Sequence, residues 1–256
     1  MLSKKIVKYI QSLSHKKLRD EEQAFIAEGP KVVEEFLASQ SFTCKIICAE
    51  KQWLLSIKEL IDTSKAAIYE IDEDSLKSIS FLNTPNKVIA VFRKKEFTAL
   101  PEVGNKITLV LDGISDPGNL GTIIRIADWF AIENIICSKN CVDCYNPKVV
   151  QSTMGSICRV NLFYEDLHSF ISSHKFISVY AASLSGDSLS TFKNIDEGFI
   201  LIGNESKGIG EKLLAISSYK ITIPRYGHAE SLNAAVATGI ILSHVKHSPN
   251  LHEELN

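Results

Sequence analysis

The first part of the chain mixes helical and strand-like hydrophobic patterns. Apolar residues recur every three to four positions through most of residues 3–40, which predicts two helices. The second helix is expected to be interrupted at Gly29-Pro30, because proline suits the first turn of a new helix. Three short apolar runs, with a helical pattern between the first two, are predicted as strands: 44–50, 67–71 and 87–95. The pattern indicates a small α/β unit.

A more regular alternation begins at Ile107. Short apolar runs there alternate with helical patterns that start near residue 119, at Pro147 and at Ser231. The predicted strands are 107–112, 134–139, 161–165, 176–184, 199–205 and 220–224. Such runs, separated by helices, are typical of a parallel sheet that is buried on both faces. The fold class is therefore α/β, with residues 1–96 as one domain, 97–106 as a linker and 107–256 as a second domain.

Composition and charge narrow the possible classes of protein. The chain has 256 residues and a formal net charge of −2, so a nucleic-acid partner would have to be bound by a local basic patch. The N-terminal segment lacks the apolar core of a secretory signal, and no apolar run is long enough to span a membrane. The six cysteines do not follow the spacing of a disulfide scaffold. These features predict a reduced, cytoplasmic protein.

One pair of cysteines has the spacing of a partial metal site. Cys141 and Cys144 form the sequence CVDC, which could supply half of a zinc site. A second cysteine pair or a spaced histidine pair that would complete four ligands is missing from the sequence. We therefore expect two loop thiols and no metal.

The loop after strand 107–112 carries the first candidate chemistry. In open parallel sheets, ligands bind outside the carboxyl ends of the strands. Gly118 and Gly121 allow a tight turn or close approach of a ligand, and Asn119 can cap the following helix, with Arg125 further along it. A simple asparagine cap with a surface arginine would explain the loop equally well. The loop matches neither a dinucleotide fingerprint nor a Walker phosphate loop.

Two further loops follow later strands. The sequence FILIGNESKGIG ends a buried strand at Gly203, Asn204 and Glu205, which places a carboxylate and open backbone amides where a ligand could be held. In ITIPRYGHAESLNAAVATGIIL, Ser231 is a plausible N-cap for a very apolar helix. A structural cap explains Ser231 but leaves Asn233 unexplained.

The three loops, in this order, resemble the three motifs of the SpoU (TrmH-like) family of RNA ribose 2′-O-methyltransferases, within the SPOUT class. The segments that carry the resemblance are NLGTIIR (119–125), LIGNESKGI (201–209) and IPRYGHAESLNAAVATGI (223–240), together with NPKVVQSTMGSICRV (146–160) between the first two. More loosely, residues 10–95 resemble the family's N-terminal RNA-binding module.

The resemblance implies a parallel-sheet SPOUT domain with a deep trefoil knot, preceded by a small α/β RNA-binding domain, and a homodimer. It also implies S-adenosyl-L-methionine as the cofactor, held largely by backbone groups of the second and third loops. The matching cofactor positions are Gly203, Asn204, Ile223 and Leu232.

The resemblance further implies a catalytic set that consists of Asn119, Arg125, Glu205, Ser231 and Asn233. Arg125 matches the arginine at the target hydroxyl. Because a guanidinium keeps its proton at neutral pH, we expect Arg125 to anchor phosphate and to stabilise the developing alkoxide rather than to act as a base. Asn119 would orient Arg125 or the ribose. Glu205 could pair with arginine or accept a hydrogen bond from the ribose.

The expected partner is RNA, with ribosomal RNA favoured over transfer RNA because of the N-terminal module. Lys16, Lys17 and Arg19 are candidate phosphate contacts, although a solvated basic helix end is an equal alternative. Two other hypotheses are kept. One is a catalytically silent relative that binds RNA or assists ribosome assembly. The other is a nucleotide-dependent enzyme of ordinary Rossmann type, which the missing glycine fingerprint disfavours.

Overall fold

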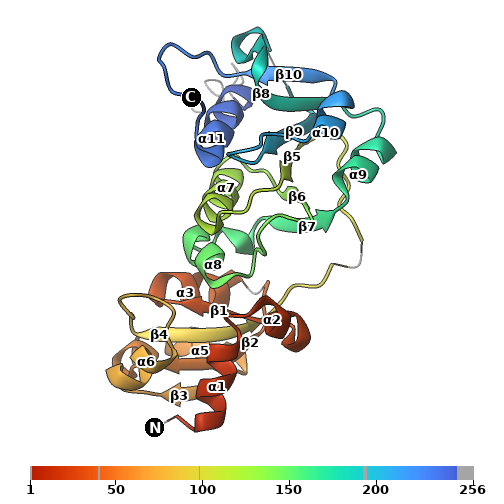
Figure 1. The fold of residues 1–256 in the computed structure, drawn as a ribbon. Helices are drawn as coiled ribbons and strands as arrows, with labels where there is room; N and C mark the ends of the chain where they lie inside the picture. Colours follow the sequence, from red (N-terminus) through yellow and green to blue (C-terminus); the bar gives the residue numbers. More distant parts are fainter. Residues whose placement is uncertain (1, 40, 98, 193–194, 247–256) are drawn as a thin grey trace, which may run out of the picture. The chain divides into compact units, whose positions relative to one another are not determined.

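A computed structural model describes residues 2–39, 41–97, 99–192 and 195–246, which form two compact α/β units (Figure 1). The first unit contains the described residues up to position 97 and also Asp143–Cys158, and the second contains Ala99–Val142 and the described residues from Arg159 onward. Residues 247–256 of the predicted second domain lie outside the described residues. Across the described ranges, no helix is both long and apolar enough to cross a lipid bilayer.

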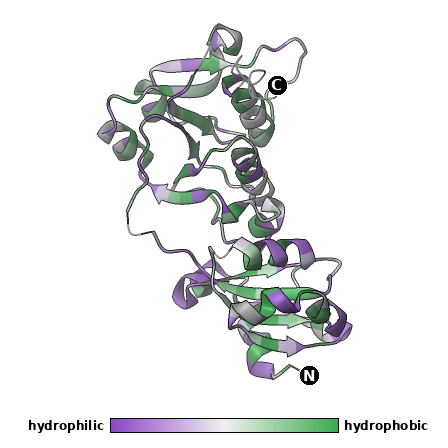
Figure 2. Ribbon diagram, turned by 180° about the vertical axis from the view of Figure 1, so that it is seen from behind, coloured by the Kyte–Doolittle hydropathy of each residue, from purple (hydrophilic) through white to green (hydrophobic). Residues whose placement is uncertain are grey.

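The first unit is built on a sheet with the strand order β1-β4-β2-β3. Its strands are β1 (Ala24–Glu28), β2 (Cys44–Ala49), β3 (Ala67–Glu70) and β4 (Val88–Arg93). Its helices are α1 (Lys4–Ser12), α2 (Lys16–Glu22), α3 (Pro30–Ser39), α4 (Lys51–Ser56), α5 (Lys58–Ser64), α6 (Glu73–Ile79) and α8 (Pro147–Thr153), followed by the 3-10 turn η1 (Ser156–Cys158). Apolar strands form the centre of this unit, as the hydropathy colouring of Figure 2 shows.

One prediction for this unit is wrong. Residues Ala24–Glu28 were expected to be helical but form strand β1, which is buried along its whole length and pairs with β4 in antiparallel register. A short, continuous apolar segment has no polar face that would reveal its period, so a buried strand and a buried helix look alike in sequence. The expected break at Gly29-Pro30 is real, but it separates β1 from α3.

The segment Asp143–Cys158 completes the core of the first unit. Tyr145 packs against Phe25 in a tilted arrangement with 4.7 Å between ring centroids, next to the rings of Phe36, Phe42 and Phe92. The Tyr145 hydroxyl also accepts a hydrogen bond from the backbone nitrogen of Lys95, at 3.1 Å. The segment Asp143–Cys158 is thus separated from the rest of the first unit in sequence by Ala99–Val142 but packs with that unit in space.

The second unit contains a wholly parallel sheet in the order β10-β8-β9-β5-β6-β7. Its strands are β5 (Ile107–Asp112), β6 (Asn134–Ser138), β7 (Asn161–Glu165), β8 (Val179–Ser188), β9 (Gly198–Gly203) and β10 (Tyr219–Thr222). The parallel sheet that the sequence predicted is confirmed. The four interior residues of β9 are almost fully buried, as expected for a central strand that is covered on both faces.

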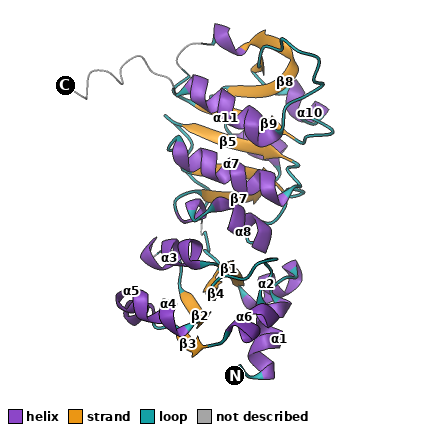
Figure 3. Cartoon of the chain, turned by 90° about the vertical axis from the view of Figure 1, so that its left-hand side faces the viewer, coloured by secondary structure: helices purple, strands orange, loops and turns teal. Residues whose placement is uncertain are grey.

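Helices cover both faces of this sheet. They are α7 (Pro117–Trp129), α9 (Leu167–Ser173), α10 (Glu211–Ala215) and α11 (Ala234–Val245), with the 3-10 turn η2 (Leu189–Thr191). Helices α7 and α11 lie side by side on one face, and α9 and α10 lie on the other (Figures 1 and 3). The loops that follow β5, β9 and β10 therefore meet at the carboxyl edge of the sheet.

Candidate active site

The first motif loop begins α7 with a cap that the sequence analysis did not identify. The side chain of Asp116 accepts a hydrogen bond from the backbone nitrogen of Asn119 at 2.8 Å, and Pro117 occupies the first helical position. The predicted capping role of Asn119 is therefore wrong. Because Asp116 satisfies the helix end, the Asn119 side chain is available for contacts with the other loops.

The helix that follows the third motif loop is also capped by a residue other than the expected one. Asn233, rather than Ser231, caps α11, and its Oδ1 accepts from the backbone nitrogens of Ala235 and Val236 at 2.9 and 3.3 Å. Ser231 is exposed two residues earlier. Asparagine and serine are similar N-caps, so the sequence could not decide between these two positions.

Asn119 joins the three loops by hydrogen bonds. Its Oδ1 accepts from Nδ2 of Asn233 at 2.8 Å, and its own Nδ2 donates to the carboxylate of Glu205. These partners lie 114 and 86 residues away in sequence. Hydrogen bonds thus bring three of the five expected catalytic residues, Asn119, Glu205 and Asn233, together in the second unit.

The direction of these hydrogen bonds is determined by the cap of α11. Since Oδ1 of Asn233 accepts from the helix, only its NH₂ group can point toward Asn119. The oxygen of Asn119 must then face Asn233, and the NH₂ group of Asn119 must face Glu205. Glu205 must therefore act as the acceptor at the end of this series of hydrogen bonds. We call the residues Asn233, Asn119 and Glu205 the amide relay.

Asn204 shapes the second loop from within. Its Oδ1 accepts from the backbone nitrogens of Ser206 and Lys207, and its Nδ2 donates to the carbonyl of Gly113 at 2.8 Å. The backbone nitrogen and carbonyl of Asn204 pair with Gly208. Asn204 is thus used to build the loop, so any contribution to cofactor binding would depend on the loop that it holds.

Two further contacts tie the second loop to the end of β5. The carboxylate of Asp112 accepts a hydrogen bond from the backbone nitrogen of Gly210 at 2.9 Å. Gly203 has no room for a Cβ atom, because the backbone of Gly208 and Ile209 fills that position. Sequence reasoning missed Asp112, although its place at the end of a central strand was a signal that could have found it.

The other predicted site residues of this unit are at the surface. Among the residues that the structure describes, Arg125 and Ser231 are exposed and do not take part in the amide relay. Arg125 lies in α7, on the same helix as Asn119. Ile223 is half-buried and Leu232 is 46% exposed, on the segment that connects β10 to α11. That segment carries exposed residues and ends at Asn233 of the amide relay.

The candidate phosphate contacts of the first unit have different environments. Lys16 and Lys17 are exposed and pair with Asp20 and Glu21 one helical turn later. The hydrogen bond to Asp20 raises the pKa of Lys16 above its ordinary value.

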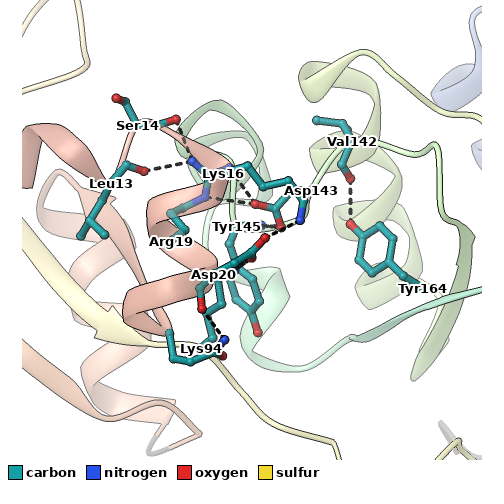
Figure 4. Close-up of polar contacts among 11 residues, drawn as sticks. Leu13, Ser14, Lys16, Arg19, Asp20, Lys94, Val142, Asp143, Tyr145 and Tyr164 are labelled. Carbon is teal, nitrogen blue, oxygen red and sulfur yellow. Dashed lines mark hydrogen bonds and ion pairs between the residues drawn. The ribbon is translucent and has the colours of Figure 1, made fainter.

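Arg19 is buried, with only 1% of its surface exposed. Figure 4 shows its guanidinium directed at the carbonyls of Leu13 and Ser14, at 2.9 and 2.8 Å, and at the carboxylate of Asp143, at 2.7 Å. The predicted phosphate contact of Arg19 does not fit this geometry, because its guanidinium is enclosed and bonded within the protein. Arg19 instead holds Asp143, in the segment that completes the first unit.

Comparisons with known proteins agree with the geometry. Residues 106–243 match the family model of the SpoU rRNA Methylase family, and residues 4–90 match an MRM3-like substrate binding domain. The chain is 29% identical over 243 residues to a 23S rRNA (guanosine(2553)-2′-O)-methyltransferase, RlmP, of Bacillus subtilis, covering 94% of this chain and 95% of that protein.

Solved structures share the fold over nearly the whole chain. One is an AdoMet-bound rRNA methyltransferase from Sinorhizobium meliloti, with 30% identity, a TM-score of 0.85 and coverage of 96% of this chain and 95% of that one. Another is a TrmH-family structure from Porphyromonas gingivalis, with 36% identity, a TM-score of 0.83 and coverage of 96% and 98%.

Proposed function

Because this chain belongs to the SpoU rRNA Methylase family, we propose that it transfers the methyl group of S-adenosyl-L-methionine to a ribose 2′-hydroxyl of RNA. The amide relay is the observation that carries this proposal. It brings three motif loops together at one edge of the sheet by direct hydrogen bonds between residues far apart in sequence.

The residues around the relay have complementary roles in this reaction. S-adenosyl-L-methionine, when bound, supplies a methyl group on a cationic sulfonium. Arg125, exposed on α7, anchors a phosphate of the RNA and stabilises the charge that develops on the 2′-oxygen. Asn119 is fixed by Asn233 and in turn positions the Glu205 carboxylate toward the ribose. Ser231, exposed beside the cap of α11, adds a hydroxyl to the same edge.

The cofactor fits the residues of the second and third loops. Gly203 lies at the end of β9 in a packed turn, and the segment after β10 is mostly exposed and carries the apolar side chains of Ile223 and Leu232. Such a surface suits a ligand with an aromatic base and several hydrogen-bonding groups. We therefore assign Gly203, Ile223 and Leu232 to cofactor binding, with Asn204 shaping the loop.

Ribosomal RNA is the proposed substrate, in preference to transfer RNA. The MRM3-like substrate binding domain at residues 4–90 supports this choice, as does the ribosomal substrate in the name of the Bacillus subtilis relative. Lys16 and Lys17, both exposed on α2, remain proposed phosphate contacts. The six cysteines do not follow the spacing of a disulfide scaffold, which is typical of a reducing compartment, and we propose the cytoplasm.

A homodimer is proposed through the outer surface of α7 and α11. Three large apolar side chains are exposed there: Trp129 at 84%, Val236 at 50% and Ile240 at 39%. These helices already pack against each other, so a second copy of the chain could cover both. The trefoil knot of the family stays a prediction for this chain.

The decisive experiment is a methyl-transfer assay. Purified protein, labelled S-adenosyl-L-methionine and ribosomal RNA from cells that lack the protein should give label on one ribose, and mapping of 2′-O-methylation should locate it. Transfer RNA from the same cells is the matched control. Binding of both cofactor and RNA without any transfer would instead support the catalytically silent relative.

A further inference from the structure

Two cysteines lie together where β6 ends in the second unit. Cys137 belongs to β6 and is fully buried, and Cys141 follows in the loop after that strand, with 8% of its surface exposed. The backbone nitrogen of Cys141 donates to the carbonyl of Ser138 at 3.0 Å, which closes a tight turn at the strand end. The turn brings the two thiols into contact, and the Cys137 thiol donates a hydrogen bond to the Cys141 sulfur.

The Cys141 sulfur is surrounded by hydrogen-bond donors. The Ser138 hydroxyl lies 3.4 Å from it and accepts from the backbone nitrogen of Gly113 at 2.8 Å, which leaves the hydroxyl hydrogen for the sulfur. The hydrogen bond from Cys137 is the largest cause that lowers the pKa of the Cys141 thiol to about 7, against the effect of burial. Ser138 and the backbone at Ile114 and Gly113 act in the same direction. Such a set of donors stabilises a thiolate, the form of cysteine that reacts with oxidants.

Two buried cysteines of the first unit have the opposite environment. Cys44 and Cys48 lie in β2 and are 5% and 0% exposed. Burial raises the pKa of each of these thiols to about 12. Both therefore remain protonated at neutral pH, and they serve as internal references for the reactivity of Cys141.

The loop that carries Cys141 is bonded to the loop after β5. The Cys141 thiol donates to the carbonyl of Leu111 at 3.3 Å. The backbone nitrogen of Val142 donates to the carbonyl of Ile114 at 2.9 Å. These contacts lie on either side of Gly113, so the position of Cys141 is coupled to that of the Gly113 turn.

Gly113 connects this turn to the second motif loop. It has a φ of 71°, and an added Cβ atom would lie 3.2 Å from Nδ2 of Asn140 and 3.7 Å from Cβ of Asn204. The carbonyl of Gly113 accepts from Nδ2 of Asn204, the residue that shapes the second motif loop. Gly113 is thus packed between the loop of Cys141 and the loop that holds the assigned cofactor residue Gly203. A displacement of Cys141 would reach the second motif loop through this turn.

We propose that Cys137 and Cys141 form a thiol pair that a hydroperoxide oxidises to a disulfide, and that the disulfide weakens the binding of S-adenosyl-L-methionine. The oxidation depends only on the pair, whereas its effect on the cofactor rests on the proposed function. In a reducing compartment the disulfide would be transient. The pair is therefore a reversible modification site that is coupled to the second motif loop.

The reaction with hydrogen peroxide has two steps. The Cys141 thiolate attacks one peroxide oxygen, so that an S–O bond forms, the O–O bond breaks and hydroxide leaves. The sulfur is oxidised to a sulfenic acid, the peroxide is reduced, and the hydroxide takes up the proton that the Cys141 thiol lost. Cys137 then attacks the Cys141 sulfur to form the S–S bond, and its proton leaves with the sulfenic hydroxyl as water. In sum, two thiols and one peroxide give one disulfide and two waters.

The disulfide changes the contacts of Cys141. An S–S bond of about 2.0 Å is much shorter than a contact between two thiols, so Cys141 must move toward Cys137. The oxidised sulfur also has no hydrogen to donate to the carbonyl of Leu111. Both changes act on the chain next to Gly113, and we expect the second motif loop to shift with it.

The first test maps the oxidised cysteines of the unmodified chain. The folded protein is treated with hydrogen peroxide, alkylated in denaturant and digested for mass spectrometry. We expect a Cys137–Cys141 disulfide, reversible by dithiothreitol, at a peroxide concentration that leaves Cys44 and Cys48 alkylated. Equal oxidation of Cys141 and Cys48 would overturn the proposal, as would an oxidised Cys141 beside a Cys137 that is still alkylated.

The second test measures cofactor binding by calorimetry. The disulfide form should bind S-adenosyl-L-methionine about tenfold more weakly than the reduced form, the effect of about one lost hydrogen bond, and dithiothreitol should restore the affinity. Peroxide should not change the affinity of Cys141→Ala. Cys144→Ala is the matched control, because it removes a nearby cysteine and keeps the pair, and it should respond as the unmodified protein does. Equal affinities of the reduced and disulfide forms would contradict the coupling, and so would a reversible response in Cys141→Ala.

The two proposals fail in different ways. If the reduced protein binds the cofactor and methylates RNA but the disulfide does not form, or forms without lowering the affinity, the inference is wrong and the enzymatic function stands. If the disulfide forms but the reduced protein neither binds the cofactor nor transfers a methyl group, the oxidation of the pair stands. The proposed methylation, and with it the effect on the cofactor, would then be wrong.

Discussion

Two arginines in this chain, Arg19 in the first unit and Arg125 in the second, have the same charge and opposite environments. Arg19 is 1% exposed and donates to two backbone carbonyls and to Asp143. Arg125 is exposed on α7, close in sequence to Asn119 of the amide relay. Both were candidates for contact with RNA when only the sequence was considered. A basic residue in a polar stretch can therefore serve the fold or the substrate, and burial decides between them.

The environment of Arg19 explains why arginine suits this position. A buried cation is tolerated only when its donors are satisfied, and the planar guanidinium can bond a carboxylate and two carbonyls at once. Its partner Asp143 begins the segment that returns to the first unit and carries Tyr145 into the aromatic cluster. The ion pair thus links α2 to a part of the chain 124 residues away.

The largest effect is expected when this buried pair is broken. Arg19→Ala leaves Asp143 buried without its cation and should destabilise the first unit by about 3–5 kcal/mol. Denaturant unfolding can be followed in a Trp129→Phe background, where Trp53, which is 4% exposed in α4, is the remaining tryptophan. The double variant Arg19→Ala/Asp143→Ala should recover part of the loss. An unchanged unfolding midpoint would mean that the pair contributes nothing to the fold.

The exposed arginine should show the opposite pattern. Arg125→Ala is expected to slow methyl transfer about 100-fold or more, because it removes charge stabilisation at the reacting oxygen. Its unfolding free energy should change by no more than about 0.5 kcal/mol, as for other surface substitutions. Arg125→Lys is the matched control, since it keeps the charge and loses the planar fork.

Cofactor binding gives a further readout for Arg125. S-adenosyl-L-methionine should bind to Arg125→Ala with nearly unchanged affinity, because the assigned cofactor residues lie on the other two loops. Full activity in the alanine variant would show that Arg125 has no role in the mechanism. Neither of the two arginines would then act on the substrate.

A smaller effect should follow when the amide relay is altered without removing any arginine. Asn119→Asp cannot donate to Glu205, so two carboxylates face each other where the relay requires a donor. We expect about a 10- to 100-fold loss of rate at neutral pH, the range for a lost hydrogen bond to a charged group.

The pH dependence tests this reasoning. Like charges raise the pKa of one carboxyl of the pair, so its protonation at lower pH restores a donor between the two residues. The defect of Asn119→Asp should therefore shrink as pH falls, whereas the defect of Asn119→Ala should not. Identical pH profiles for the two variants would argue against a directional relay.

Sequence patterns predicted the parallel sheet of the second unit because its strands are continuous apolar runs between helices. They could not identify β1, whose buried apolar segment fits either a strand or a helix. They also assigned the helix caps to the wrong residues: Asp116 and Asn233 cap α7 and α11, where Asn119 and Ser231 were expected. Choices between nearby capping residues depend on tertiary contacts.

The place of the segment from Asp143 to Cys158 was equally beyond sequence reasoning. Its membership in the first unit depends on contacts of Asp143 and Tyr145 with residues more than a hundred positions earlier. Local patterns carry no information about such pairs. By contrast, Asn119, Glu205 and Asn233 were found because a family resemblance reports which distant loops act together.

The smallest effect concerns the neighbours of Arg19 on the same helix. Lys16 and Lys17 pair with Asp20 and Glu21, with 65% and 85% of their side chains exposed, so solvent screens these ion pairs. Lys16→Ala/Lys17→Ala should leave the unfolding free energy nearly unchanged, in contrast to Arg19→Ala. If the two lysines contact phosphate, the logarithmic salt slope of RNA binding should fall by about 1. An unchanged slope would show that α2 does not contact RNA. Arg19 would then stabilise the fold from a buried position, and the two lysines would only form a solvated surface.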